Sequence, residues 1–121
     1  MNQIGIPNLD KKLEASLIAD MVKVEELMRS HIQGDYPLVV ETSRHLVEAG
    51  GKRLRPLLTL IAAQFGDPTN YDIIKAAVCC ELTHLATLYH DDVMDDAVLR
   101  RGVISANKKW NNAVAILTGD Y

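Results

Sequence analysis

Apolar residues recur every three or four positions from Leu9 to Ile32, which is the spacing of one face of an α-helix. These positions are Leu9, Leu13, Leu17, Met21, Val24, Met28 and Ile32. Charged residues lie between them, so the pattern predicts an amphipathic helix with one buried stripe. Asn8 is the expected N-cap of this helix, and Gly34 is the expected stop.

Two further helices are predicted before residue 66. Asp35 is placed to cap the first of them, with Pro37 in its first turn, and the Gly50-Gly51 pair ends it. The second begins at Pro56 and is apolar on almost every side up to Phe65, so we expect it to be buried all round.

The longest predicted helix spans residues 70–95, with Asn70 as its cap and its end near Met94 or Asp95. Its many apolar residues make it the central, buried element. A short loop follows, then a short helix capped by Ser105 and another capped by Asn112. No strand alternation is seen, so the expected fold class is all-α, with antiparallel helices.

Composition narrows the function classes. Thirteen basic and sixteen acidic residues give a net charge of −3, which argues against general nucleic-acid binding. The two cysteines are neighbours, Cys79 and Cys80, and adjacent residues make a poor disulfide, so we expect small core residues in a reducing compartment. The sequence shows no signal-peptide pattern and no apolar run of membrane-spanning length, so the cytoplasm is the expected location.

Candidate chemistry concentrates between Glu81 and Gly102. On a helix, His84, Leu88, Asp91 and Asp95 share one face. Carboxylates one turn apart suit Mg²⁺, which one or two protein carboxylates often hold together with substrate phosphates. Arginine binds phosphate oxygens in bidentate fashion, and two arginines, Arg100 and Arg101, follow at once. The stretch therefore predicts a metal site beside an anion site. Asp96 has no obvious role and is expected to be solvated.

A second basic group lies between the glycine pair and Pro56: Lys52, Arg53 and Arg55. Glycines permit the backbone to approach a ligand closely, and the N-terminus of the following helix favours anions. An ordinary basic loop is the alternative interpretation.

Together these motifs resemble those of the trans-isoprenyl diphosphate synthases, the polyprenyl synthetase family. HDDVMD followed by RRG is similar to the first aspartate-rich motif of that family, and GGKRLRP matches a second stretch. The resemblance implies an isoprenoid-synthase helical bundle. It also implies that residues 1–121 are the N-terminal portion of a polyprenyl synthetase domain, truncated before the second aspartate-rich motif.

The resemblance implies a Mg²⁺-dependent prenyltransferase that condenses isopentenyl diphosphate head-to-tail with an allylic diphosphate. Asp91 and Asp95 are the implied metal ligands and catalytic residues, and Arg100 the implied holder of the allylic diphosphate. The implied ligands of isopentenyl diphosphate are Lys52, Arg55, His84 and Arg101. Asp92 is expected to support the ligands from behind, and His90 either to be structural or to support the ligands in the same way.

Product length is implied by the residues four and five positions before Asp91. Thr87 and Ala86 are small, whereas family members with bulky aromatics there stop at short products, so a long-chain product is expected. Tyr89 lies about 160° from Asp91 around the helix and is expected to pack outward. The family also implies a homodimer, with residues 105–121 near the shared surface, and a heterodimer with a small subunit stays open.

The motifs allow three other interpretations. The chain could be an inactive fragment or a non-catalytic subunit that binds a diphosphate without turnover. An HD-type phosphohydrolase would use His90-Asp91, but it leaves GGKRLRP and RRG unexplained. A terpene cyclase can share the aspartate motif, but it has no need of basic groups for a second diphosphate.

Overall fold

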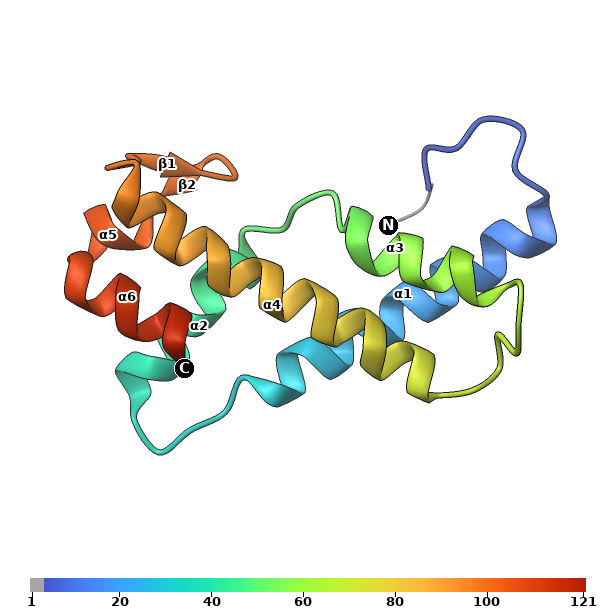
Figure 1. Ribbon diagram of the computed structural model, residues 1–121, viewed down its shortest axis with the longest axis horizontal. Coiled ribbons are helices and arrows are strands. Elements are labelled where there is room, and N and C mark those ends of the chain that lie inside the picture. The colour runs from blue at the N-terminus through green and yellow to red at the C-terminus, as the bar shows by residue number, and fades with distance from the viewer. Residues whose placement is uncertain (1–3) are drawn as a thin grey trace. The chain divides into compact units, whose positions relative to one another are not determined.

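The computed structural model describes residues 4–121, and Figure 1 shows its elements in order. Six helices and one two-stranded hairpin are found in this range: α1 Lys11–His31, α2 Pro37–Glu48, α3 Leu54–Ala63, α4 Asp72–Met94, β1 Leu99–Arg100, β2 Val103–Ile104, α5 Ala106–Lys109 and α6 Asn112–Asp120. The predicted all-α class is confirmed. None of the helices within this range has the length and apolar character needed to cross a membrane.

The chain divides into two compact units, and α1 and α4 each contribute to both. The first unit holds α1 up to Met28, α3, and α4 up to Glu81. Its core is the predicted stripe of α1 with apolar residues of α3 and α4. The buried members are Leu17, Met21, Val24, Met28, Leu57, Leu60, Ile74, Ala77 and Val78.

A buried arginine joins the three helices of the first unit. Arg53 is 5% exposed and adopts a left-handed backbone conformation at the N-cap of α3. Its Nε donates to Glu25 of α1 at 2.5 Å, and its Nη1 donates to Glu81 of α4 at 3.2 Å. Because the Glu81 side chain is also buried, this arginine supplies the charge that allows a carboxylate in the core.

Several local predictions for the first unit are wrong. Asp10, not Asn8, caps α1, because its carboxylate accepts the Leu13 amide at 3.0 Å. The third helix is buried on one side only, since Leu54 is 55% and Leu58 54% exposed, and Phe65, beyond its end, is 94% exposed. Both cysteines are exposed and do not belong to the core.

The start of α4 is confirmed: Asn70 accepts the Asp72 amide at 3.0 Å. The helix runs to Met94, as the apolar pattern indicates.

The second unit holds residues 29–52 and 82–121, with α2, the rest of α4, the hairpin, α5 and α6. Its core residues are Leu46, Val47, Leu85, Leu88, Tyr89, Ala106 and Ala115. Two caps differ from expectation. Tyr36, not Asp35, precedes α2, and Asn111, not Asn112, caps α6 by accepting the Val114 amide at 2.8 Å.

A short hairpin occupies the stretch where we expected a plain loop. Leu99 pairs with Ile104 and Arg100 with Val103 in antiparallel register, which leaves Arg101 and Gly102 as a two-residue turn. Both turn residues have positive φ, 53° and 77°, as a type I′ turn requires. The turn thus explains why glycine follows the arginine pair.

Candidate functional site

The two carboxylates of the aspartate motif lie at the C-terminal end of α4, in the second unit. Asp91 is half-buried and Asp95 exposed, and the Asp95 amide donates to the Asp91 carbonyl at 2.8 Å, so they stand one helical turn apart. Within residues 4–121, neither side chain has a hydrogen-bond or ion-pair partner. They therefore remain available to a cation from outside the chain.

Asp92 lies behind this pair and is 1% exposed. Its carbonyl accepts the Ala97 amide at 2.9 Å, while the Asp96 amide donates to the Val93 carbonyl at 3.3 Å. Because the backbone of Asp96 is in the left-handed conformation, these two hydrogen bonds form the Schellman motif that ends a helix. The backbone of Asp92 is thereby fixed at the last turn of α4.

The side chain of Asp92 holds Arg100 of β1. Both Nε and Nη2 of Arg100 donate to the same oxygen, Oδ1, at 2.9 and 2.5 Å. These hydrogen bonds raise the pKa of Arg100, and the charges of Asp92, Asp91 and Asp95 add to the effect. The guanidinium therefore lies in the field of the two free carboxylates, where a cation and an anion can be bound side by side.

Arg101 is held by other residues than Arg100. Its Nη1 donates to the Leu46 carbonyl of α2 at 2.9 Å, and its guanidinium lies against the backbone of Gly51. The RRG and GGKRLRP motifs thus meet in the second unit through Gly51 and Arg101.

The remaining predicted anion ligands are exposed or half-buried. Lys52 is exposed at the end of the second unit's first segment, and Arg55 is exposed in the first turn of α3, in the first unit. His84 is half-buried on α4, two turns before Asp91. The structure brings Arg100 into the field of Asp91 and Asp95 at the end of α4, whereas the guanidinium of Arg101 lies at the Leu46 carbonyl and Gly51.

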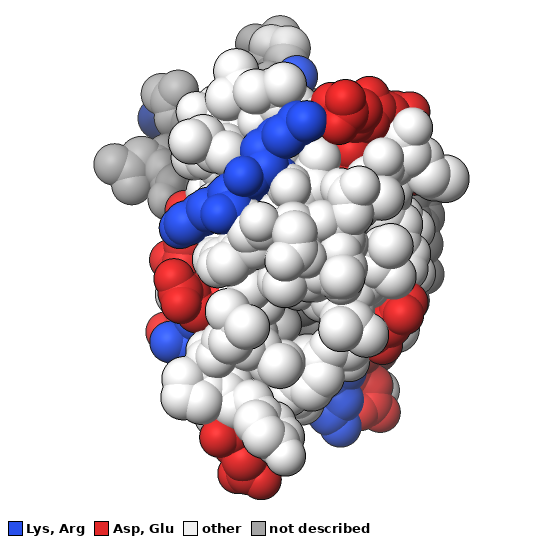
Figure 2. Space-filling view, turned by 90° about the vertical axis from the view of Figure 1, so that its left-hand side faces the viewer, with Lys and Arg blue, Asp and Glu red and all other residues white. Residues whose placement is uncertain are grey.

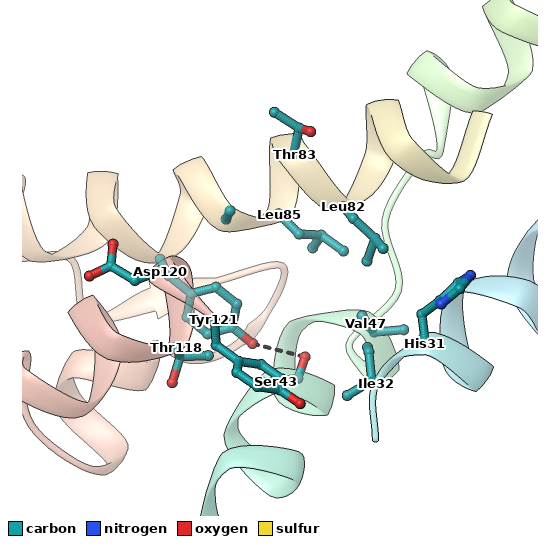
Figure 3. Close-up of a pocket in the computed structure, with 13 residues that line it drawn as sticks. His31, Ile32, Ser43, Val47, Leu82, Thr83, Leu85, Thr118, Asp120 and Tyr121 are labelled. Atoms are coloured by element: carbon teal, nitrogen blue, oxygen red, sulfur yellow. Dashed lines mark hydrogen bonds between the residues drawn. The ribbon is translucent and has the colours of Figure 1, made fainter. Parts of the chain in front are cut away.

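A pocket of about 330 Å³ lies in the second unit, lined from α2, α4, α6 and the end of α1 (Figure 3). Its volume is at the lower end of the range for small-molecule sites. Ala86 lines it, as does Leu85. Thr87 does not line it: the side chain is exposed, and its hydroxyl donates to the His84 carbonyl at 2.6 Å.

The prediction that Tyr89 packs outward is wrong. Tyr89 is 3% exposed and lines the same pocket. Its hydroxyl donates to the Thr42 carbonyl at 2.6 Å and accepts the Leu46 amide at 3.2 Å, and it lies 3.3 Å from the Ser43 carbonyl. The prediction used only the angle between Tyr89 and Asp91 around α4. That angle does not show which side of α4 is covered by other helices, and α2 covers the side that carries Tyr89.

His90 and Asp96 have structural surroundings. The His90 ring contacts the Ile116 carbonyl at 3.0 Å and the Asp120 carboxylate at 3.1 Å, both on α6, which agrees with a structural role. Asp96 is largely exposed and pairs with Lys108 at 2.7 Å.

The donor set fits a hard cation only in part. No group of three or more His, Cys, Asp or Glu side chains that could hold a metal ion is found in the described range. Asp91 and Asp95 supply oxygen donors without competing partners, which is the minimum set for Mg²⁺ when phosphates supply further oxygens. Figure 2 shows one face of the molecule, on which a diagonal band of basic side chains is bordered by acidic side chains at its ends.

Sequence reasoning missed the burial of Arg53 in the first unit, the pairing of Asp92 with Arg100, and the orientation of Tyr89. Arg53 shares a motif with Lys52 and Arg55, and nothing in the sequence separates a buried arginine from its exposed neighbours. The Asp92–Arg100 pair was not foreseen because the hairpin that brings it together was not foreseen. Tyr89 was misplaced for the reason given above.

Comparison with known proteins gives the class of this fold and site. The polyprenyl synthetase family model matches residues 36–121. The nonaprenyl diphosphate synthase of Mycobacterium tuberculosis is 45% identical over 118 residues, which is 97% of this chain and 35% of that protein. Heptaprenyl diphosphate synthase component 2 of Bacillus subtilis is 43% identical over 122 residues, 98% of this chain and 34% of that protein.

A solved structure is similar as well. The crystal structure of polyprenyl synthase from Caulobacter crescentus, complexed with calcium and isoprenyl diphosphate, matches with a TM-score of 0.81 and 41% identity, over 88% of this chain and 34% of that one. Geranylgeranyl diphosphate synthases also match, so the comparisons define a class and not a product length.

The chain belongs to the polyprenyl synthetase family, and the resemblance inferred from its two motifs is confirmed. It spans about a third of the length of the curated relatives that it matches.

Proposed function

We propose that this chain is the N-terminal portion of an all-trans polyprenyl diphosphate synthase, a prenyltransferase that joins isopentenyl diphosphate head-to-tail to an allylic diphosphate. The observation that carries the proposal is the end of α4. There two carboxylates without protein partners, Asp91 and Asp95, share an electrostatic field with Arg100.

Each predicted ligand has a role in this proposal. Asp91 and Asp95 hold Mg²⁺, which when bound neutralises the charge of the allylic diphosphate as it leaves. Arg100, oriented by Asp92, holds the same diphosphate. Isopentenyl diphosphate is held by the remaining basic residues: Lys52, Arg55, His84 and Arg101.

The reaction then needs little covalent chemistry from the protein. The allylic C–O bond breaks and its electron pair leaves with the diphosphate. The double bond of isopentenyl diphosphate attacks the allylic cation, a new C–C bond forms, and a proton is lost to restore a double bond. The protein contributes orientation and electrostatic stabilisation of the developing charge.

Replacement of the two carboxylates tests the metal-binding role. In an active, full-length form, Asp91→Asn or Asp95→Asn should lower the rate by at least ~10²-fold, because neutralisation of the leaving group is a major part of the rate enhancement. Asp96→Asn is the matched control, since Asp96 lies in the same acidic run but is bonded to Lys108. Near-normal turnover of Asp91→Asn at saturating Mg²⁺ would reject the role.

A second candidate is a non-catalytic fragment or subunit that binds a diphosphate without turnover. It is favoured by the donor count, because Asp91 and Asp95 have no third metal ligand in the described range. Incorporation of radiolabelled isopentenyl diphosphate separates the candidates when the 121-residue chain is compared with a form as long as its relatives. Binding by both but incorporation by the longer form alone would assign the catalytic role to the longer form.

We also propose a long-chain product. In support, the small side chain of Ala86 lines the pocket, whereas Thr87 lies outside it, so Ala86 is the residue to test. Ala86→Phe adds an aromatic wall that a packed interior cannot absorb cheaply. Products should shorten while the first condensation survives, and Thr87→Phe should have the smaller effect. Release of only C15 or C20 diphosphate by the unmodified enzyme would contradict the proposal.

The partner that we propose is a second copy of the chain. The name of the B. subtilis relative, component 2, keeps a heterodimer with a different subunit as the alternative. Sedimentation of the purified protein alone separates them, because a homodimer needs no second component.

A further inference from the structure

The hydroxyl of Tyr89 bonds to the backbone of a neighbouring helix, α2. The Thr42 carbonyl and the Leu46 amide are four residues apart, which is the spacing of one hydrogen bond in this continuous helix. In α2 the Leu46 amide donates to the Tyr89 hydroxyl at 3.2 Å, and that hydroxyl donates to the Thr42 carbonyl at 2.6 Å. Tyr89 thereby sets the position of the turn that contains Leu46.

The same turn holds Arg101. The Leu46 amide faces Tyr89, and the Leu46 carbonyl accepts Nη1 of Arg101 at 2.9 Å. A displacement of this one peptide segment would therefore move the acceptor that orients the guanidinium.

Gly51 bounds the guanidinium on another side. A Cβ at this position would lie 2.9 Å from Cζ and 3.0 Å from Nε of Arg101, closer than side-chain atoms approach. Gly51 also has a φ of 135°, which side chains other than glycine rarely adopt. The absence of a side chain at Gly51 makes the space that Arg101 occupies.

We propose that Tyr89 and Gly51 are positioning residues that seat Arg101, and that through this seat they set the affinity for isopentenyl diphosphate. The inference rests on the proposed function, in which Arg101 binds that substrate. Neither residue touches the substrate in this proposal. Tyr89 acts through the Leu46 carbonyl, and Gly51 acts by leaving room.

The chemistry of the hydroxyl supports the role. It must donate and accept at once, so it has to remain protonated. Phenylalanine has the same ring and can neither donate nor accept.

Removal of the hydroxyl is the first test. The dissociation constants of the 121-residue chain for isopentenyl diphosphate, and for geranyl diphosphate with Mg²⁺, are measured by calorimetry. Tyr89→Phe should raise the dissociation constant for isopentenyl diphosphate about tenfold. It should change the dissociation constant for geranyl diphosphate by less than about twofold. Tyr36→Phe is the matched control, because Tyr36 precedes α2 but is largely exposed. An equal loss for both ligands, or none, would overturn the proposal.

A combined variant distinguishes positioning from a general loss of structure. In an Arg101→Ala background, Tyr89→Phe should have no further effect on isopentenyl diphosphate, because the group that it positions is gone. A further loss of similar size in that background would show that Tyr89 acts by another route. If the unmodified chain bound no isopentenyl diphosphate, the proposed function would fail together with this inference.

The glycine pair gives a second test, which stands if Tyr89→Phe does not fold. Gly50 and Gly51 both have positive φ, but a Cβ on Gly50 would meet nothing within 4 Å. Gly51→Ala should therefore weaken the binding of isopentenyl diphosphate at least about fivefold more than Gly50→Ala does, although both substitutions strain the backbone. Equal effects of the two substitutions would overturn the role of Gly51.

Discussion

Gly119 of α6 lies against the imidazole ring of His90 in α4 with no room for a side chain between them. A Cβ on Gly119 would overlap the ring and lie 3.0 Å from the carbonyl oxygen of Ala86. The ring can turn, but the carbonyl belongs to the α4 backbone and cannot. This contact sets how closely α6 packs on α4 beside the pocket.

Gly119→Ala should therefore destabilise the protein although alanine favours helix. We expect a loss of about 1–3 kcal/mol in the free energy of unfolding, because overpacking moves α6 away from α4. Denaturant unfolding followed by circular dichroism measures it. Gly66→Ala is the control, since a Cβ there would meet only the Ala63 carbonyl at 3.9 Å. An unchanged midpoint for Gly119→Ala would contradict the packing argument.

The buried ion pair of Arg53 makes a second prediction. Arg53→Met leaves the carboxylate of Glu81, which is 2% exposed, without its counter-charge. The expected loss in the free energy of unfolding is about 3–5 kcal/mol. The double variant Arg53→Met/Glu81→Met should be more stable than the single variant, because the buried carboxylate of Glu81 is removed together with its counter-charge. Lys23→Met, which removes an exposed cation paired with Asp20, should cost less than about 1 kcal/mol.

The raised pKa of Tyr89 predicts a loss of stability in alkali. In the unfolded chain tyrosine ionises near pH 10, whereas folded Tyr89 holds its proton to about pH 12. Between these values the unfolded state binds fewer protons than the folded state, so stability falls as pH rises. The contribution is on the order of 2–3 kcal/mol.

Comparison of two proteins isolates this effect from other titrations. The free energy of unfolding is measured from pH 8 to 12 for the unmodified protein and for Tyr89→Phe. The slope above pH 10 should be shallower in Tyr89→Phe, which has no hydroxyl at this position to ionise. Parallel curves would show that Tyr89 titrates normally.

The left-handed residue at the end of α4 predicts a stabilising substitution. Asp96 has a φ of 50°, a conformation that glycine adopts without cost. Asp96→Gly should raise the free energy of unfolding by about 0.5–1 kcal/mol, because the exposed pair with Lys108 contributes little. Asp96→Ala loses the same ion pair and keeps the strain, so it should unfold at a lower temperature than Asp96→Gly.

Some features of the fold follow from local chemistry and could be predicted. The long apolar period of α4 and its Asn70 cap are local, and both are found. The hairpin escaped prediction because strands of two residues are too short to show alternation. Three other cap positions were wrong by one or two residues, since Asp10, Tyr36 and Asn111 stand where Asn8, Asp35 and Asn112 were expected.

The candidate site could also be predicted only in part. The aspartate and arginine motifs can be recognised because their spacing along the chain carries the pattern. Their supports cannot, because Tyr89, Leu46 and Gly51 come from segments distant in sequence and their relation exists only after folding. Tyr89 illustrates the difference: one helix alone suggests that it faces outward, and the helix beside it buries it.

The turn at Arg101 bears on how this protein can be engineered. Asn-Gly is the dipeptide that most readily forms such a turn, whereas an arginine there carries a conformational penalty. A library randomised at position 101 and screened for heat resistance alone should enrich asparagine or glycine and discard the guanidinium. Heat resistance would then rise as ligand affinity fell, so variants of this hairpin have to be selected for both properties at once.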